Sequence, residues 1–196
     1  MSYEDEYEYK PSILSIIWSW IWSFIVAFII VGGVYFFLGR PFTVSGASMY
    51  PTLHNGDRMV LSKVGDIHRF DVVILKAPDE NVEYIKRVIG MPGDKVEMKN
   101  GVLYINGKKV DQPFINTETL AKQTVFMDDF TLESLTGESK VPAGKYFVLG
   151  DNRGVSKDSR MIGFIDRSAI EGKAVFTIWP FGRIGGQKDY GYLYSE

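Results

Sequence analysis

Three short segments of the sequence carry residue types that can do chemistry together. Residues 45–53 (SGASMYPTL) place Ser48 in a turn, directly after small residues. Residues 84–90 (YIKRVIG) place Lys86 inside an apolar run, and residues 150–160 (GDNRGVSKDSR) bring hydroxyl, acidic and guanidinium groups into one loop. A serine hydroxyl is a poor nucleophile until a nearby base takes its proton. The set therefore predicts a hydrolase in which Ser48 is the nucleophile.

Two kinds of residue qualify as the base for Ser48. The sequence has two histidines, His54 and His68, and either fits a Ser-His-Asp triad. Lys86 qualifies because strand alternation places it on the same face as Tyr84, and a lysine in apolar surroundings has a lowered pKa. A lysine with a lowered pKa acts as a general base near neutral pH. Taken alone, Lys86 is more often a surface lysine with a solvated amine, and we interpret both histidines as surface or loop residues.

Composition excludes several classes of protein. The sequence contains no cysteine, which rules out disulfides, thiolate zinc sites and a cysteine nucleophile. Lys and Arg total 22 against 24 for Asp and Glu, a net charge of −2 that gives no basic face for nucleic acid. We therefore expect no nucleic-acid partner. Because histidines are few as well, we also expect no metal site and no cofactor.

An uncharged apolar segment at residues 13–38 has the length of a membrane span. As a helix it would measure about 39 Å at about 1.5 Å per residue, enough to cross a hydrocarbon core of ~30 Å with some tilt. Trp18, Trp20 and Trp22 lie toward one end, and indole rings favour the headgroup boundary. The segment is too long for a cleaved signal sequence and no basic stretch precedes it, so we expect a retained anchor. The flanking basic residues balance, which leaves its orientation open.

The rest of the chain, residues 40–196, is predicted to be mainly β with non-local pairing. Apolar runs of strand length recur between turn residues, at residues 58–62, 72–75, 82–89, 101–105, 145–149 and 174–179. Asn106 and Gly107 form a pair favoured in tight type I′ hairpins. Residues 128–135 are the best candidate for a short helix. Residues 93–144 are more polar and are interpreted as an inserted lobe or an exposed hairpin region.

The chain resembles type I signal peptidases, the membrane-bound proteases that remove signal peptides from exported proteins. It is most similar to the short, single-anchor form of Gram-positive bacteria. The resemblance rests on four segments in a fixed order, residues 46–53, 65–75, 84–94 and 150–160. Any one of them is modest evidence, whereas four in order and at suitable spacing are strong.

The resemblance implies roles for the residues of these segments. Ser48 would be the nucleophile and Lys86 the general base of a Ser-Lys dyad. Ser156 would form a hydrogen bond with the lysine amine and position it. Asp158 and Arg160 would support the site through a salt bridge.

The resemblance also implies an organisation and an orientation. Residues 1–39 would be an N-terminal tail and single transmembrane helix, with the N-terminus in the cytoplasm. Residues 40–196 would be an extracytoplasmic peptidase domain of antiparallel β-sheet, with a smaller lobe inserted at residues 93–144. Gly46 departs from one branch of the family, which has a serine there that helps to bind the oxyanion. Beside the Ser48 backbone N–H, the second oxyanion donor is then left to Ser45, another backbone N–H or water.

Substrate recognition follows from the same resemblance. Signal peptides end in a small-x-small pattern, so the pockets must be shallow and apolar, and an extended peptide would pair with two strands at their edges. The residues implied to line these pockets are Phe42, Val44, Met49, Leu53, Tyr84 and Ile85. The expected partners are exported preproteins that carry signal peptides, and the lipid bilayer. Tyr50 and the aromatic residues at 179–181 either touch the bilayer surface or pack in the core.

Two hypotheses from other classes remain open. One is a membrane-tethered, non-catalytic assembly or binding module, which we would expect to lack Ser48 or Lys86; this sequence has both. The other is a self-cleaving Ser-Lys regulator of related fold. A regulator of that kind is expected to have a DNA-binding head, whereas the apolar segment occupies that part of this sequence.

Overall fold

The computed structural model describes residues 12–38, 41–115 and 129–194, with side chains 34–38 left out, and divides the chain into two compact units. The first unit is Met1–Phe37 and the second is Leu38–Glu196. Residues 1–11 of the expected tail and residues 116–128 of the expected lobe lie outside the described part of the chain.

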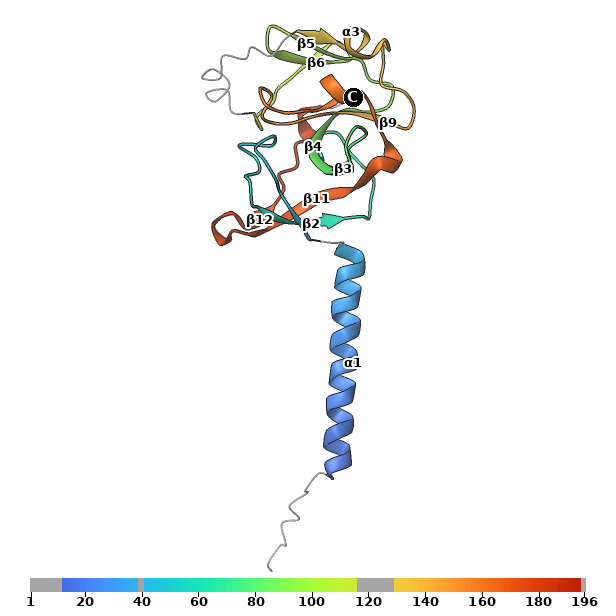
Figure 1. Cartoon of the computed structure of the whole chain (residues 1–196), viewed down its shortest axis with the longest axis vertical. Coiled ribbons are helices and arrows are strands. Elements are labelled where there is room, and N and C mark those ends of the chain that lie inside the picture. Colours follow the sequence, from blue (N-terminus) through green and yellow to red (C-terminus); the bar gives the residue numbers. More distant parts are fainter. Residues whose placement is uncertain (1–11, 39–40, 116–128, 195–196) are drawn as a thin grey trace, which may run out of the picture. The chain divides into compact units, whose positions relative to one another are not determined.

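Helix α1 (Ile13–Leu38) is the described part of the first unit (Figure 1). Its 26 residues include no charged side chain, which is why the backbone forms one uninterrupted apolar helix. Within it, Ile13–Gly33 is a stretch of 21 residues with a mean hydropathy of 2.3, and its side chains are almost all exposed. By length and composition this helix is able to cross a membrane, as the sequence predicted.

An antiparallel sheet of eight strands forms most of the second unit. Its strands are β1 (Pro41–Thr43), β2 (Arg58–Ser62), β3 (Val72–Lys76), β4 (Glu83–Gly90), β9 (Lys145–Leu149), β10 (Ile165–Asp166), β11 (Ile170–Trp179) and β12 (Gly185–Gly186). They lie in the order β1-β2-β11-β3-β4-β9-β10, with β12 paired to β11. The prediction of a mainly β, antiparallel fold is confirmed.

A smaller antiparallel sheet lies at the opposite end of this unit from β2 and β12 (Figure 1). Its strands are β5 (Val96–Lys99), β6 (Val102–Ile105), β7 (Lys108–Val110) and β8 (Phe130–Thr131), in the order β7-β6-β5-β8. Asn106 and Gly107 join β6 to β7, and both have positive φ, 51° and 78°. A type I′ turn requires positive φ at both positions, so the predicted hairpin is confirmed.

The helices in the described part of the second unit are all short. They are α3 (Leu132–Thr136), α4 (Ser159–Ile162) and the 3-10 turns η1 (Arg167–Ala169), η2 (Phe181–Arg183) and η3 (Gly191–Leu193). The helix predicted at residues 128–135 is wrong in its bounds, because Phe130 and Thr131 pair with β5 as strand β8. The α3 helix begins only after Thr131, whose side chain accepts a hydrogen bond from the Ser134 backbone N–H, and it ends at Gly137 in the left-handed region.

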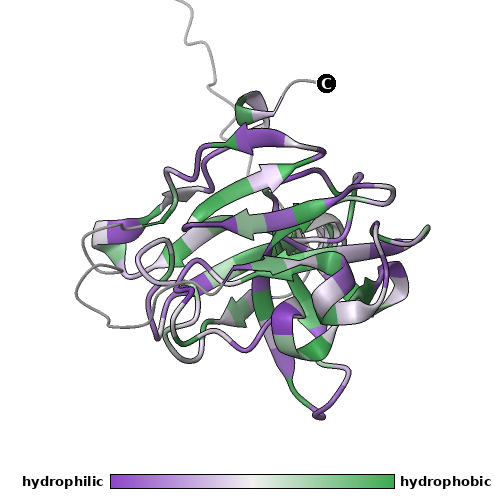
Figure 2. Ribbon diagram, turned by 90° about the horizontal axis from the view of Figure 1, so that it is seen from above, coloured by the Kyte–Doolittle hydropathy of each residue, from purple (hydrophilic) through white to green (hydrophobic). Residues whose placement is uncertain are grey.

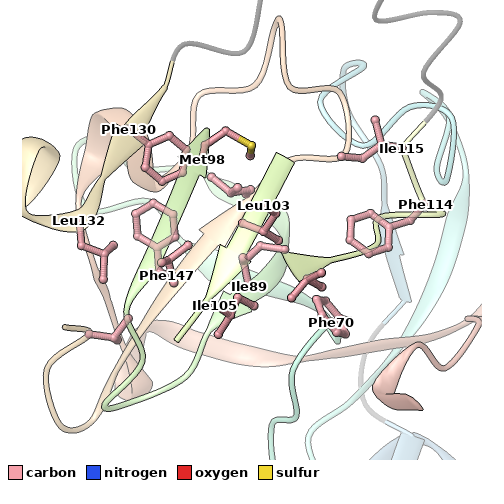
Figure 3. Close-up of a cluster of buried hydrophobic side chains, with 14 residues drawn as sticks. Phe70, Ile89, Met98, Leu103, Ile105, Phe114, Ile115, Phe130, Leu132 and Phe147 are labelled. Carbon is pink, nitrogen blue, oxygen red and sulfur yellow. The ribbon is translucent and has the colours of Figure 1, made fainter. Parts of the chain in front are cut away.

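A cluster of buried hydrophobic side chains joins the two sheets (Figure 3). The smaller sheet contributes Met98, Leu103 and Phe130, which pack with Ile89 and Phe147 of the larger one. Phe147 and Phe130 have ring centroids 5.8 Å apart. Figure 2 shows that hydrophobic residues recur in the strands, while many connecting loops are hydrophilic. The strand ladders are thus held by side-chain burial across the two sheets as well as by their own hydrogen bonds.

We predict that Phe147→Ala lowers the free energy of unfolding of the second unit by about 3–5 kcal/mol, because it leaves a cavity where a fully buried ring stood. Urea-dependent pulse proteolysis of the full chain in mild detergent measures this loss. Phe181→Ala is the matched control, since its ring is 75% exposed, and it should shift stability by no more than about 0.5 kcal/mol. Equal losses in the two variants would contradict the assignment of the core.

Candidate active site

Ser48 lies in a turn between β1 and β2, and this turn is held by backbone hydrogen bonds and by the buried side chains of its neighbours. Tyr50 N–H donates to the Ala47 carbonyl at 3.1 Å, and Leu53 N–H donates to the Met49 carbonyl at 2.9 Å. The side chains of Met49 and Leu53 are buried in the cluster between the turn and the larger sheet. Ser48 itself is only partly buried. Burial of its neighbours therefore fixes the turn and leaves the serine hydroxyl accessible.

Lys86 lies in β4, a strand in the interior of the larger sheet. Its side chain is 3% exposed, and its Nζ donates to Ser48 Oγ at 3.1 Å and to the Ile85 carbonyl at 3.0 Å. Tyr84 lies on the same face of the strand, as alternation predicted, and its ring centroid is 4.9 Å from Lys86 Nζ. The structure thus brings the two central residues of the sequence prediction into direct contact.

Burial lowers the pKa of Lys86 to about 8, while the charge of Asp158 opposes this shift. The cause is the loss of water around the amine, which disfavours its charged form. At slightly alkaline pH a large share of the amine is therefore neutral. A neutral amine at hydrogen-bond distance from a serine hydroxyl is able to accept its proton.

The loop after β9 holds the serine turn through its backbone. Asn152 N–H donates to the Ser48 carbonyl and Asn152 Nδ2 to the Ala47 carbonyl, both at 3.0 Å. Gly150 makes this approach possible, because a Cβ there would lie 2.5 Å from the Ser48 carbonyl oxygen and 2.2 Å from Ser156 Oγ. Any larger residue at position 150 would push the serine turn and the loop apart.

Asp158 and Arg160 form the expected ion pair. Arg160 Nε donates to Asp158 Oδ1 at 2.8 Å, and Asp158 Oδ2 accepts the Gly150 N–H at 3.0 Å. Arg160 Nη2 also donates to the Arg153 carbonyl at 2.8 Å. Asp158 is fully buried, so these bonds satisfy a carboxylate that has no access to water. The pair fixes the loop that carries Ser156.

Ser156 does not form the hydrogen bond with Lys86 that the resemblance implies. Its side chain is buried, and Ser156 Oγ has no hydrogen-bond partner within the described part of the chain. The Lys86 amine instead donates to Ser48 and to the Ile85 carbonyl. Ser156 Oγ lies against the Cα side of Gly150 in this structure.

A cleft of about 460 Å³ opens over Ser48 and Lys86. Of the six residues expected to bind substrate, Phe42, Tyr84 and Ile85 line this cleft. The other three, Val44, Met49 and Leu53, are buried in the hydrophobic cluster with Ile85 and do not line it. Val155 and Lys157, which the sequence analysis did not assign to the pocket, line it as well.

Two strand edges border this cleft. Strand β1 pairs with β2 alone among the described strands. Strand β4 pairs with β3 over Glu83–Arg87. Its pairing with β9 begins only at Arg87, so the part of β4 before Lys86 has one open edge within the described sheet. An extended peptide between these edges would run alongside the backbones of both strands.

A buried ion pair lies beside the site, and the sequence analysis did not find it. Arg87 Nε donates to Asp151 Oδ1 at 2.8 Å and Arg87 Nη2 to Asp151 Oδ2 at 2.6 Å. The Thr52 hydroxyl donates to the same carboxylate at 2.5 Å, and the Arg87 guanidinium lies 4.3 Å from the Phe114 ring centroid. The pair therefore joins β4, the loop after β9 and the serine turn. Arg87 and Asp151 both lie in the segments singled out from the sequence, 84–90 and 150–160. A sequence pattern does not show which residues so far apart will form a pair.

The two histidines lie away from the dyad. His68 is exposed, with Nδ1 3.7 Å from Asp71 Oδ2, and His54 packs edge-on against the Tyr50 ring with centroids 5.0 Å apart. Within the described residues, neither histidine forms a hydrogen bond to Ser48. No group of three or more His, Asp or Glu side chains suited to a metal ion occurs in that part of the chain.

Comparison with known proteins gives concordant matches. The family model described as "Signal peptidase, peptidase S26" matches residues 17–179. Signal peptidase I of Bacillus caldolyticus is 42% identical over 166 residues, 81% of this chain and 89% of that one. Signal peptidase IB of Staphylococcus aureus is 46% identical over 154 residues, 74% of this chain and 80% of that one.

A solved structure is similar as well. The crystal structure of a signal peptidase I from Enterococcus faecalis matches with a TM-score of 0.51 and 38% sequence identity. The match covers 56% of this chain and 97% of that one.

We predict that Arg87→Met lowers the free energy of unfolding by about 3–5 kcal/mol, because it leaves the buried Asp151 carboxylate without its cation. The double variant Arg87→Met with Asp151→Leu should lose less than Arg87→Met alone. The matched control is Lys145→Met, which breaks an exposed ion pair with Asp166 at 3.3 Å and should shift stability by about 0–1 kcal/mol. Urea-dependent pulse proteolysis compares the variants, and similar losses in the two single variants would refute the claim.

Proposed function

Because the chain belongs to the signal peptidase family, peptidase S26, we propose that it removes N-terminal signal peptides from exported preproteins after small-x-small sites by a Ser-Lys dyad. Members of this family are serine endopeptidases, and signal-peptide removal is the activity that the match supports. The observation that carries the dyad is the 3.1 Å contact between Lys86 Nζ and Ser48 Oγ in the cleft.

The proposed reaction begins with the neutral amine of Lys86, which takes the proton from the Ser48 hydroxyl. The Ser48 oxygen then bonds to the scissile carbonyl carbon, and the carbonyl oxygen becomes an oxyanion. As the peptide bond breaks, the Lys86 ammonium returns its proton to the leaving amine of the mature protein. Water, deprotonated in turn by Lys86, attacks the acyl carbon and releases the signal peptide as a carboxylic acid. The Lys86 ammonium returns its proton to the Ser48 oxygen as the ester bond breaks.

The oxyanion needs hydrogen-bond donors aimed at its position. We assign the Ser48 backbone N–H as one donor. The Gly46 N–H is already donated to Asn55 Oδ1 at 2.9 Å, which argues against it as the second. Ser45 lines the same cleft, so its hydroxyl or a water held there is our choice for the missing donor.

Specificity for small side chains would arise between the open edges of β1 and β4. An extended substrate would add to these edges, and alternate side chains would point at the wall formed by Phe42, Tyr84 and Ile85. The side chains of Val44, Met49 and Leu53 are buried beneath this wall, and they would limit the depth of the pocket.

We further propose the division of the chain as an anchor at residues 1–39 and a peptidase domain at 40–196, with an inserted lobe near 93–144. The helix α1 supports a single membrane crossing, and the family supports a membrane location. We place the catalytic domain on the extracytoplasmic side, where exported preproteins emerge. Trp179 and Phe181 are exposed in that domain, which favours a second contact with the lipid bilayer over core packing for these residues. We propose that the chain has no nucleic-acid partner.

We predict that Ser48→Ala and Lys86→Met each lower precursor cleavage by about 10³-fold or more while the protein stays folded. The assay is mass analysis of a preprotein with an Ala-x-Ala site after incubation with the detergent-solubilised full chain. His54→Ala and His68→Ala are the controls and should keep near-wild-type activity. Substantial cleavage by Lys86→Met, or loss in a histidine variant, would remove lysine from the proposed mechanism.

The pH dependence follows from the lowered pKa of Lys86. Because the neutral amine is the active form, kcat/KM should rise with pH through a midpoint near the pKa of about 8 and then level off. Below that midpoint the rate should fall about tenfold per pH unit. A pH–rate profile on an internally quenched peptide measures the midpoint, and a value near the ~10.4 of an ordinary lysine would contradict the burial argument.

A further inference from the structure

Lys157 bridges two segments at the rim of the cleft. It lies between Ser156 and Asp158 in the final loop, and its side chain is 42% exposed. Its Nζ lies 2.5 Å from Asp79 Oδ2 and also donates to the Glu80 carboxylate. Both acids belong to the connection between β3 and β4, so one ammonium group fastens that connection to the final loop.

The same ammonium reaches the site through Tyr84. Lys157 and Tyr84 line the same cleft, and the Tyr84 hydroxyl is one of the groups that raise the pKa of Lys157. The Tyr84 ring lies over the Lys86 amine, with its centroid 4.9 Å from Nζ. Ion pairs thus link Asp79 and Glu80 to Lys157, and Lys157 shares the cleft wall with Tyr84, whose ring contacts Lys86.

The amine that this chain reaches is faced by few charged groups. From its own strand it meets the Tyr84 ring and the Ile85 carbonyl, and from the serine turn the Ser48 hydroxyl. The charge that acts on it is that of Asp158 in the final loop, which is itself paired with Arg160.

Tyr84, like Ser48, is partly buried at the cleft wall. It borders the open edge of β4, where no described strand covers it from the β9 side. If the ring moved outward, water would reach Lys86 from the cleft. What holds the Tyr84 ring therefore helps to decide how dry the amine stays.

We propose that Lys157 is a positioning residue of this enzyme: bound to Asp79 and Glu80, it holds the Tyr84 ring over Lys86 and keeps water from the amine. The proposal rests on the proposed function, in which Lys86 is the general base. It gives an exposed ion-pair cluster a role in keeping Lys86 dehydrated, although the cluster does not contact Lys86 directly.

The charges of the cluster support this role over the working pH range. The two carboxylates raise the pKa of Lys157, and Lys157 in turn lowers the pKa of Asp79. The bridge therefore stays ionised while Lys86 titrates. A change in rate near pH 8 then reports Lys86 and not the bridge.

The test compares Lys157→Met with Lys157→Arg in the full detergent-solubilised chain. Without the bridge, Lys86 becomes better hydrated and its pKa rises toward the ordinary value. In Lys157→Met the acid limb of the kcat/KM profile should move up by about 0.5 pH unit, which is about a threefold loss at pH 7 with an unchanged alkaline plateau. Lys157→Arg, which keeps the charge, should stay closer to wild type. The double variant Asp79→Asn with Glu80→Gln should reproduce the shift.

Lys145→Met is the matched control, since it removes a partly exposed lysine with a carboxylate partner, Asp166, and should leave the profile unmoved. An acid limb that stays at the wild-type pH in Lys157→Met overturns the proposal. So does a lower plateau with an unmoved limb, because that result assigns Lys157 a purely structural role.

A second readout separates this proposal from the proposed function. Acetic anhydride labels neutral amines, so the pH dependence of Lys86 labelling in a Ser48→Ala background gives its pKa without any cleavage. If Lys86 titrates as an ordinary lysine before Lys157 is changed, the proposed function fails. If it titrates near 8 and Lys157→Met does not move it, the proposed function stands and the role of Lys157 is refuted.

Discussion

The structure depends on the burial of one amine that has no carboxylate partner of its own among the described residues. Lys86 is almost fully buried, and its hydrogen bonds go to a hydroxyl and a carbonyl, neither of which carries charge. Asp158 is near enough to act on it through space, but its oxygens already bind Arg160 and the Gly150 N–H. The ammonium form thus gains little from its surroundings and loses the hydration that water would give. The pKa of the amine is therefore lowered to about 8, and the rest of the site supplies what its neutral form needs.

Strand alternation allows a reactive cation and a structural one to stand next to each other in β4. Lys86 points to one face, toward Ser48, whereas Arg87 points to the other, toward Asp151. The guanidinium is satisfied by a bidentate carboxylate, by the Phe70 carbonyl at 2.8 Å and by aromatic contact, so its position is fixed. Because Asp151 also binds Thr52, this second cation fixes the distance between β4 and the serine turn. The ion pair between Arg87 and Asp151 thereby positions Ser48 next to Lys86.

Sequence alone predicted the parts of this arrangement that are local. The apolar helix, the strands β2, β3, β4, β6, β9 and β11, and the Asn106–Gly107 turn all leave periodic or compositional signals within a few residues. The two-residue strands β8, β10 and β12 leave none, since their pairing is decided by distant partners. The same holds for Gly150, whose need for a bare Cα comes from the carbonyl of Ser48, and for Val44, Met49 and Leu53. Val44, Met49 and Leu53 were expected to line the pockets. The serine turn needs buried side chains to hold it, and these three side chains are buried beneath Ser48.

The position of Lys86 along β4 explains how one strand can serve both binding and chemistry. Up to Lys86 the strand is paired with β3 alone among the described strands. It pairs with both β3 and β9 at Arg87, and with β9 beyond it. The residues before Lys86 therefore offer backbone groups that an extended peptide can pair with, whereas those after it are dry core. An amine placed further along the strand would be out of reach of a substrate, and one placed earlier would be solvated and protonated. Lys86 stands at this boundary, where a bound peptide and the proposed base can meet.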